Sequence, residues 1–162
     1  MAYLVVIRGP LGVGKTTIAH QLAQEISAHY ISIDEVLVEN GLDRSSGDFD
    51  VQDFIKANNF IIPRIKKKLS ANQSVVLDGN FYFLEPIEQL VNEVPVPVHV
   101  FTLKAPLNVC ILRDSQRDMS YGKEAATAVY DLVKRFDYGE AIDASNSIQN
   151  TINAILIYLK DK

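Results

Sequence analysis

Short apolar runs alternate along the chain with segments whose apolar residues recur at helical spacing. The apolar runs cover residues 3–7, 30–33, 74–77 and 98–103, and the segment Glu-Ala-Ile-Asp at 140–143 looks like a short fifth strand. Because each run is followed by apolar positions three or four residues apart, the pattern predicts five strands with helices between them. Such alternation favours a parallel sheet covered on both faces. We therefore expect an α/β fold, a three-layer α/β/α sandwich around a five-stranded parallel sheet, with residues 1–162 as one domain.

The longest helical pattern extends over residues 50–69, and Pro63 lies inside it. Proline removes a helical hydrogen bond, so we expect Pro63 to kink or interrupt this helix. Another helix is expected over residues 81–94, directly after the third run. Residues 40–48 are rich in glycine and serine and are expected to form a loop.

The composition is typical of a globular domain, with 48% hydrophobic and 22% charged residues. A net charge of −4 and a pI near 5.3 give the chain no general attraction for nucleic acid or anionic membranes. No apolar run is long enough to cross a bilayer, so we expect no membrane association and a cytoplasmic location. The single cysteine, Cys110, excludes an intrachain disulfide and is expected in the core.

The stretch from residue 9 to residue 16 reads GPLGVGKT and directly follows the first apolar run. Gly9, Gly12 and Gly14 allow positive φ angles, so that successive N–H groups can surround an anion. The helix that follows adds its free N–H groups and the positive end of its dipole. Lys15 offers a cation to the β- and γ-phosphates, and Thr16 offers a hydroxyl to Mg²⁺. The pattern predicts a nucleotide phosphate site.

Two aspartates directly follow apolar runs. Asp34 ends the second run and Asp78 ends the third. Ligands of open parallel sheets gather beyond the carboxyl ends of the strands, so both carboxylates are expected near the phosphate loop. Asp34 can alternatively cap the next helix, and the two roles are compatible. Asp78 is expected to hold Mg²⁺ through its water shell.

The chain resembles the P-loop small-molecule kinases, which include shikimate, gluconate and adenylate kinases. The resemblance rests on GPLGVGKTT at residues 9–17, Asp34, LDGN at 77–80 and APLNVCILRDSQR at 105–117. The guanine-reading N-K-x-D motif of GTPases does not occur in the sequence. The resemblance implies an ATP- and Mg²⁺-dependent phosphotransferase that acts on a hydroxyl or phosphate of a small molecule.

The resemblance also implies roles for individual residues. The ATP-binding residues would be Gly9, Gly12, Val13, Gly14, Lys15, Thr16, Thr17, Arg113 and Ser145. Arg113 would lie near the adenine, and Ser145 would bracket the adenine with backbone. Asp34 would accept the proton of the acceptor hydroxyl or orient that hydroxyl. Thr16 would bind Mg²⁺, and Asp78 would support the metal or the substrate.

A small helical lid, about residues 113–137, is implied as well. Arg117 would reach the transferring phosphate when this lid closes. Arg135 is either a second lid arginine or part of a surface salt bridge.

The identity of the acceptor stays open. Shikimate kinases have D-x-D and a triple glycine where this chain has Ser-Ile-Asp at 32–34 and Asp-Gly-Asn at 78–80. Asn80 and Tyr82 can hydrogen-bond an acceptor hydroxyl, and Asn80 is the candidate substrate residue.

Two other functions fit the same motifs. A kinase acting on a polynucleotide end needs a basic groove, for which only the run Arg64 to Lys68 is available. A non-catalytic module that binds ATP needs no acceptor at all. We favour a small-molecule acceptor over nucleic acid.

Overall fold

The computed structural model describes residues 1–43 and 50–161. The strands of the described part are β1 (Leu4–Arg8), β2 (His29–Ser32), β3 (Val75–Asp78), β4 (Val98–Lys104) and β5 (Glu140–Asp143). Its helices are α1 (Lys15–Glu25), α2 (Ile33–Glu39), α3 (Val51–Ser70), α4 (Leu84–Glu93), α5 (Leu107–Ser115), α6 (Lys123–Val133) and α7 (Ile148–Lys160). No helix within these ranges has the length and apolar character needed to cross a membrane.

The strands form a five-stranded sheet in the order β2-β3-β1-β4-β5, and every neighbouring pair is parallel. In the central strand, Ile7 lies beside Asp78 of β3 and Phe101 of β4. The carboxyl ends of these strands therefore share one edge of the sheet, where the loop that begins at Gly9 leaves β1. This topology confirms the predicted parallel sheet.

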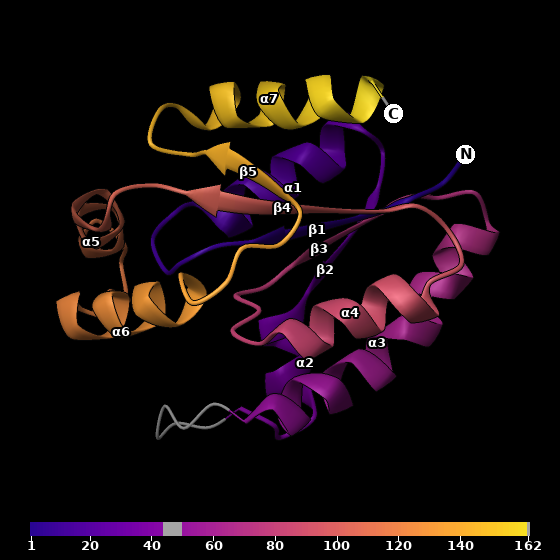
Figure 1. The fold of residues 1–162 in the computed structure, drawn as a ribbon, viewed down its shortest axis with the longest axis horizontal. Helices are drawn as coiled ribbons and strands as arrows, with labels where there is room; N and C mark the ends of the chain where they lie inside the picture. Colours follow the sequence, from indigo (N-terminus) through magenta and orange to yellow (C-terminus); the bar gives the residue numbers. More distant parts are fainter. Residues whose placement is uncertain (44–49, 162) are drawn as a thin grey trace.

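Helices cover both faces of this sheet, as Figure 1 shows. One core contains Leu4 and Val6 of β1 and packs against α2, α3, α4 and α6. The other contains Val5 and Ile7 and packs against α1 and α7. Successive side chains of a strand point to opposite faces, so β1 contributes to both cores. Cys110 of α5 is buried in the second core, as predicted.

Two predicted boundaries were wrong, and the interruption expected at Pro63 does not occur in α3. The second strand ends at Ser32, and Asp34 lies in the first turn of α2. The helix α3 continues through Pro63, which lies on its exposed side, while the buried Ile61, Ile62 and Ile65 hold the helix against the sheet. The fourth helix begins at Leu84 instead of residue 81.

The late start of α4 has a local cause. Phe81 has a positive φ of 50°, which no α-helical residue adopts, and its side chain is fully buried. Tyr82 is also buried, so the apolar residues that resemble a helix face in the sequence pack from a loop instead. Of the loop predicted over residues 40–48, residues 44–48 lie outside the described part.

Arg8, the last residue of β1, is fully buried. Its guanidinium donates to the carbonyl oxygens of Val133 (2.9 Å) and Phe136 (3.2 Å), at the end of α6. It also donates to Thr102 Oγ1 and to the Phe81 carbonyl. Burial lowers the pKa of Arg8 to about 10, which leaves it charged at neutral pH. Arg8 thereby joins the strand that carries the phosphate loop to the end of the predicted lid.

Candidate active site

The predicted phosphate loop connects β1 to α1 and packs against α5. Gly12 and Gly14 have positive φ angles of 82° and 103°, and Gly14 is the N-cap of α1. A Cβ atom at Gly12 would collide with the backbone carbonyl of Cys110, so only glycine fits there. The helix begins at Lys15, which places its first free N–H groups beside the loop.

Lys15 is buried below this loop, with 8% of its surface exposed. Its Nζ donates to the Pro10 carbonyl at 3.1 Å. Burial lowers the pKa of Lys15, whereas the carboxylates of Asp78 and Asp34 raise it. The ammonium therefore lies within the electrostatic reach of both aspartates that sequence analysis selected.

Thr16 and Asp78, the two residues predicted to serve a metal ion, are in direct contact. Thr16 Oγ1 donates to Asp78 Oδ2 at 3.0 Å, and Tyr30 donates its hydroxyl to the same oxygen at 3.0 Å. Tyr30 in turn stacks on His20, with ring centroids 3.7 Å apart. Burial and the neighbouring Asp78 raise the pKa of Tyr30 strongly, so the phenol stays a donor.

Tyr30 was not selected from the sequence. Its position in an apolar strand is typical of a core residue, and no local signal shows that its hydroxyl reaches another strand.

Asp34 is not the cap of α2. The side chain of Ser32 caps this helix by accepting a hydrogen bond from the Glu35 N–H at 3.3 Å, which leaves the Asp34 carboxylate to face a cavity. Partial desolvation by the surrounding protein raises the pKa of Asp34, although the residue as a whole remains exposed. Lys15 opposes this shift, while Asp78 and Asp43 add to it.

This cavity, which we call the acceptor cavity, has a volume of about 610 Å³. It is lined by Leu11, Lys15, Thr16, Asp34, Leu37, Val38, Asp43, Phe54, Asn80, Tyr82, Arg117, Tyr121, Ala125 and Val129. Asn80 donates its side-chain amide to the Tyr82 hydroxyl at 2.6 Å, and Tyr82 packs edge-on against Phe54. The predicted Lys15, Thr16, Asp34, Asn80 and Arg117 therefore meet at one space.

A second hollow, of about 410 Å³, lies on the other side of the phosphate loop. It is lined by Gly12, Val13, Gly14, Thr17, Ile18, Arg113, Gln116, Arg117, Ala144, Asn146, Ser147, Ile148 and Thr151. We call it the nucleotide hollow. Arg117 lines both spaces, so it lies at their junction.

Arg113 joins the walls of the nucleotide hollow. Its guanidinium donates to the carbonyl oxygens of Val13 (3.1 Å) and Ala144 (2.7 Å), and also to those of Ser145 and Asn146. These bonds tie the phosphate loop to the segment that follows β5. The residues on either side of Ser145 line the hollow, whereas Ser145 lines an open recess beside Pro106.

The turn between α5 and α6 is organised by Asp114. This buried carboxylate accepts hydrogen bonds from Ser120 Oγ at 2.7 Å and from the Gly122 N–H at 3.0 Å. Arg117 Nη1 lies 3.9 Å from its other oxygen. Burial alone would raise the pKa of Asp114, but the hydrogen bonds hold it below its usual value. Asp114 is not among the site residues predicted from the sequence.

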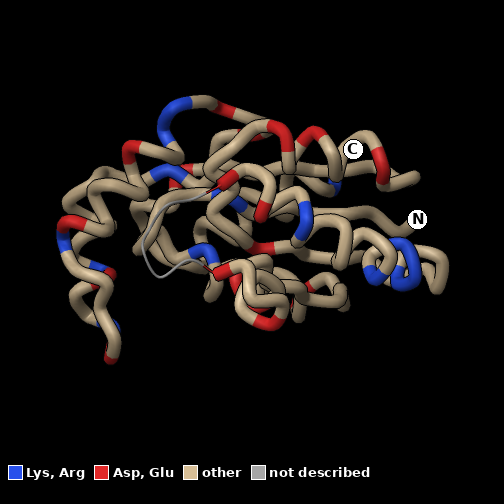
Figure 2. The backbone as a smooth tube through the Cα atoms, turned by 90° about the horizontal axis from the view of Figure 1, so that it is seen from below, with Lys and Arg blue, Asp and Glu red and all other residues tan. Residues whose placement is uncertain are grey.

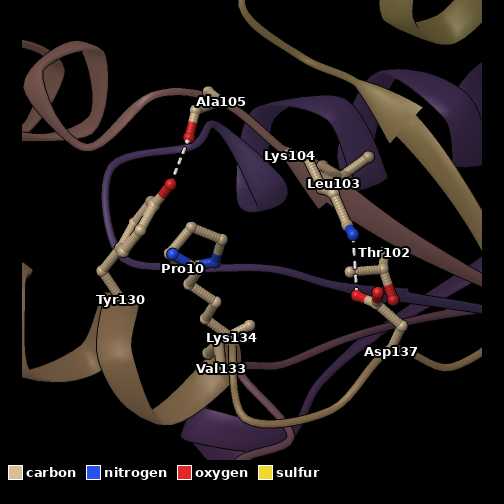
Figure 3. Close-up of a pocket in the computed structure, with 9 residues that line it drawn as sticks. All are labelled: Pro10, Thr102, Leu103, Lys104, Ala105, Tyr130, Val133, Lys134 and Asp137. Atoms are coloured by element: carbon tan, nitrogen blue, oxygen red, sulfur yellow. Dashed lines mark hydrogen bonds and ion pairs between the residues drawn. The ribbon is translucent and has the colours of Figure 1, made fainter.

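A smaller pocket of about 130 Å³ lies between β4 and α6 (Figure 3). Its walls are joined by the bond from the Tyr130 hydroxyl to the Ala105 carbonyl and by the ion pair of Lys104 with Asp137. None of the predicted site residues lines it.

The basic run from Arg64 to Lys68 lies away from both spaces. The helix α3 carries Phe54 to the acceptor cavity, and its rise of 1.5 Å per residue places Lys68 about 21 Å further along. Figure 2 shows basic residues grouped near the N terminus, at the opposite edge of the sheet. Arg135 is exposed and lines neither the acceptor cavity nor the nucleotide hollow.

The glycine loop, the parallel sheet and the two adjoining spaces define a P-loop kinase-like protein. Residues 4–136 match the model of the family AAA_33, described as an AAA domain, and the chain belongs to this family of P-loop kinase domains. A crystal structure of an unliganded sugar kinase from Janibacter sp. HTCC2649 has the same fold, with a TM-score of 0.82 at 20% identity. That match covers 99% of this chain and 95% of the other.

Two curated relatives belong to different enzyme classes. A protein of Pyrococcus furiosus named "Putative adenylate kinase" is 30% identical over 88 residues, which cover 54% of this chain and 46% of that protein. The tRNA dimethylallyltransferase of Lachnoclostridium phytofermentans is 26% identical over 169 residues, covering 96% of this chain and 53% of that enzyme. The chain therefore spans about half the length of the curated relatives it matches.

Proposed function

We propose that this protein is an ATP-dependent kinase that transfers the γ-phosphate to a hydroxyl of a small molecule. The observation that carries the proposal is the lining of the acceptor cavity. Lys15, Thr16 and Arg117, which suit phosphate and metal, share this cavity with Asp34, which suits an alcohol.

The residues present fit ATP and Mg²⁺. Thr16 Oγ1 and Asp78 Oδ2 are hard oxygen ligands 3.0 Å apart, of the kind that Mg²⁺ prefers. The nucleotide hollow adjoins the free N–H groups of α1, and Gly12 has no Cβ that would obstruct the approach of phosphate. When bound, ATP and Mg²⁺ supply the transferred phosphoryl group and neutralise charge on its oxygens.

The side chains of this protein would align the acceptor with the phosphoryl group and balance the charge on that group. Asp34 accepts the proton of the acceptor hydroxyl or orients that hydroxyl toward the phosphate. Lys15 and Arg117 place positive charge around the transferring group, where developing charge needs it. The turn from α5 to α6 carries Arg117 and would exclude water that competes with the acceptor.

An ADP-release assay tests this proposal. ATP and Mg²⁺ are held constant while sugars, nucleosides, nucleotides and aminoglycosides are added singly. We expect at least one acceptor to stimulate ADP release, and we expect Arg117→Ala to lower kcat on the order of 10²-fold. ATP binding without stimulation by any acceptor would instead indicate a non-catalytic ATP-binding module.

The structure offers less support for a polynucleotide acceptor than for a small-molecule acceptor. The basic residues from Arg64 to Lys68 that would hold a strand lie about 15 to 21 Å beyond Phe54 along α3. A steep loss of acceptor binding with salt would favour a polynucleotide, and we expect a shallow one.

A further inference from the structure

Two hydroxyl groups from different elements meet on one oxygen of Asp78. Thr16 of α1 and Tyr30 of β2 each donate to Asp78 Oδ2 at 3.0 Å. Asp78 is buried, with 4% of its surface exposed, so its carboxylate depends on protein donors for its hydrogen bonds. Of these three residues, only Tyr30 has no part in the proposed function.

The strand register brings Tyr30 to Asp78. In the register of β2 and β3, Tyr30 lies beside Val76, and Asp78 follows Val76 by two residues. Alternate residues of a strand point to the same face, so Tyr30 and Asp78 project from one face of the sheet. This is the face that α1 covers, because Val76 packs in the same core as the buried residues of that helix. The long side chain of tyrosine thereby reaches the end of the neighbouring strand.

The ring of Tyr30 is held by its surroundings. It packs against the core that contains Val76 and the buried face of α1. His20 of α1 stacks on it, with ring centroids 3.7 Å apart and the planes at 29°. A phenol has a single proton, and this packing directs the proton of Tyr30 at Asp78 Oδ2.

We propose that Tyr30 is a positioning residue of the metal site, which fixes the Asp78 carboxylate in the orientation that holds Mg²⁺ through its water shell. This inference rests on the proposed function, because it assigns a role at the same metal site. Thr16 shares its hydroxyl between Asp78 and the metal, whereas Tyr30 gives its proton to Asp78. Loss of a hydrogen-bond partner behind a metal-binding group typically costs about 10- to 100-fold in metal affinity.

The substitution Tyr30→Phe separates positioning from packing, because it removes the hydroxyl and keeps the ring that stacks on His20. The probe ion is Mn²⁺, which takes the same oxygen ligands as Mg²⁺ and whose free form is counted by EPR. With the protein saturated by a non-hydrolysable ATP analogue, we expect Mn²⁺ to bind about tenfold or more weakly to the variant than to the wild type. Calorimetric titration of the analogue in EDTA should give equal affinities for the two proteins, because the phosphate loop is unchanged.

Tyr130→Phe is the matched control. The Tyr130 hydroxyl donates to the Ala105 carbonyl at 3.2 Å and not to a residue of the metal site. We expect this variant to keep the wild-type affinity for Mn²⁺.

Asp78→Asn tests whether Tyr30 acts through Asp78. We expect the double variant that combines Tyr30→Phe with Asp78→Asn to bind Mn²⁺ no more weakly than Asp78→Asn alone. A residue that acts only through the carboxylate has no further effect once that carboxylate is gone.

Four results would overturn the inference. The wild type binds no Mn²⁺, or Tyr30→Phe binds it with wild-type affinity. Analogue affinity in EDTA falls as much as Mn²⁺ affinity, which indicates a packing role. The losses from Tyr30→Phe and Asp78→Asn add up in the double variant, which shows that Tyr30 acts independently of Asp78.

Binding is measured with an analogue that cannot transfer phosphate, so the two proposals fail separately. A Mn²⁺ site that depends on Tyr30, without ADP release in the acceptor assay, refutes the kinase and leaves the positioning role standing. ADP release together with a Mn²⁺ site that is insensitive to Tyr30→Phe refutes the positioning role and leaves the kinase standing.

Discussion

Asp34 illustrates at the scale of one residue how function and stability can oppose each other. Its pKa is raised because the cavity wall removes water and because Asp78 and Asp43 lie near. A raised carboxyl pKa means that the folded protein favours the protonated form. The stabilising contribution of that form is therefore present at low pH and is lost as pH rises through the pKa of the folded state.

The substitution Asp34→Asn separates these effects. We expect kcat to fall about 10²- to 10⁴-fold, because a positioned proton acceptor is lost. At pH 7 we expect the melting temperature to stay equal or to rise, because the substitution removes the repulsion between Asp34 and the nearby carboxylates of Asp78 and Asp43. Steady-state kinetics and thermal unfolding measure the two quantities. A variant that is both active and less stable would contradict the assignment.

The wild-type pH profile provides a second check on Asp34. We expect kcat/KM to fall as pH decreases through a pKa above that of an ordinary aspartate, since only the ionised carboxylate accepts a proton. An acidic limb at the usual aspartate pKa would contradict the expected upward shift of the Asp34 pKa.

At the scale of elements, the close contact between the phosphate loop and α5 depends on the absence of a side chain at Gly12. We expect Gly12→Ala to weaken ATP binding at least tenfold, because the new methyl group would displace the phosphate loop from Cys110. Gly41 is a matched control: its φ is also positive, at 64°, but a methyl group there meets no atom within 4 Å. Calorimetric titration of both variants with ATP measures the effect. Equal losses of ATP affinity in the two variants would show that backbone strain alone causes the loss.

The turn between α5 and α6 depends on the hydrogen bonds that Asp114 accepts from Ser120 and Gly122. We expect Asp114→Asn to lower the free energy of unfolding by about 1.5–3 kcal/mol at pH 7, the range of hydrogen bonds to a charged group. Because the pKa of Asp114 is lowered, this stabilisation is present at neutral pH and disappears as pH falls through that pKa.

Urea unfolding at pH 7 and at acidic pH measures this difference, with the exposed Asp118→Asn as control. We also expect Asp114→Asn to lower kcat, since Arg117 loses its neighbour. A stability loss that is independent of pH would show that the charge of Asp114 is not its cause.

The elements were predictable where one local signal dominates. All five strands were predicted, the first four from apolar runs, and the phosphate loop was predicted from its glycines and Lys15. Errors arose where tertiary packing overrides local pattern: Phe81 and Tyr82 are buried from a loop, and Pro63 lies inside a helix that its apolar face stabilises.

The site residues that were not predicted from the sequence bond partners that lie far away along the chain. Tyr30 bonds Asp78 from a neighbouring strand, and Arg8 reaches Val133 and Phe136. Tyr30 lies inside a strand and Arg8 ends one. Neither sequence context reveals a bonding partner that is distant along the chain.

At the scale of the whole molecule, Arg8 connects β1 with β4 and with the end of α6. We expect Arg8→Met to lower the free energy of unfolding by about 3 kcal/mol or more, because several buried carbonyls lose their donor. Arg64→Met, at an exposed position, should change it by no more than about 0.5 kcal/mol. Guanidinium unfolding of both variants measures the difference, and similar values would show that the Arg8 bonds add little.

The central claim is that the two adjoining spaces pass a phosphoryl group from ATP to an alcohol. The most direct test is a ³¹P NMR time course of a reaction that contains ATP, Mg²⁺, the wild-type protein and a stimulating acceptor. We predict a growing phosphate-ester signal that matches ADP formation and is absent with Asp34→Asn. ADP accompanied only by inorganic phosphate, or ATP that stays intact with every acceptor, would contradict the account.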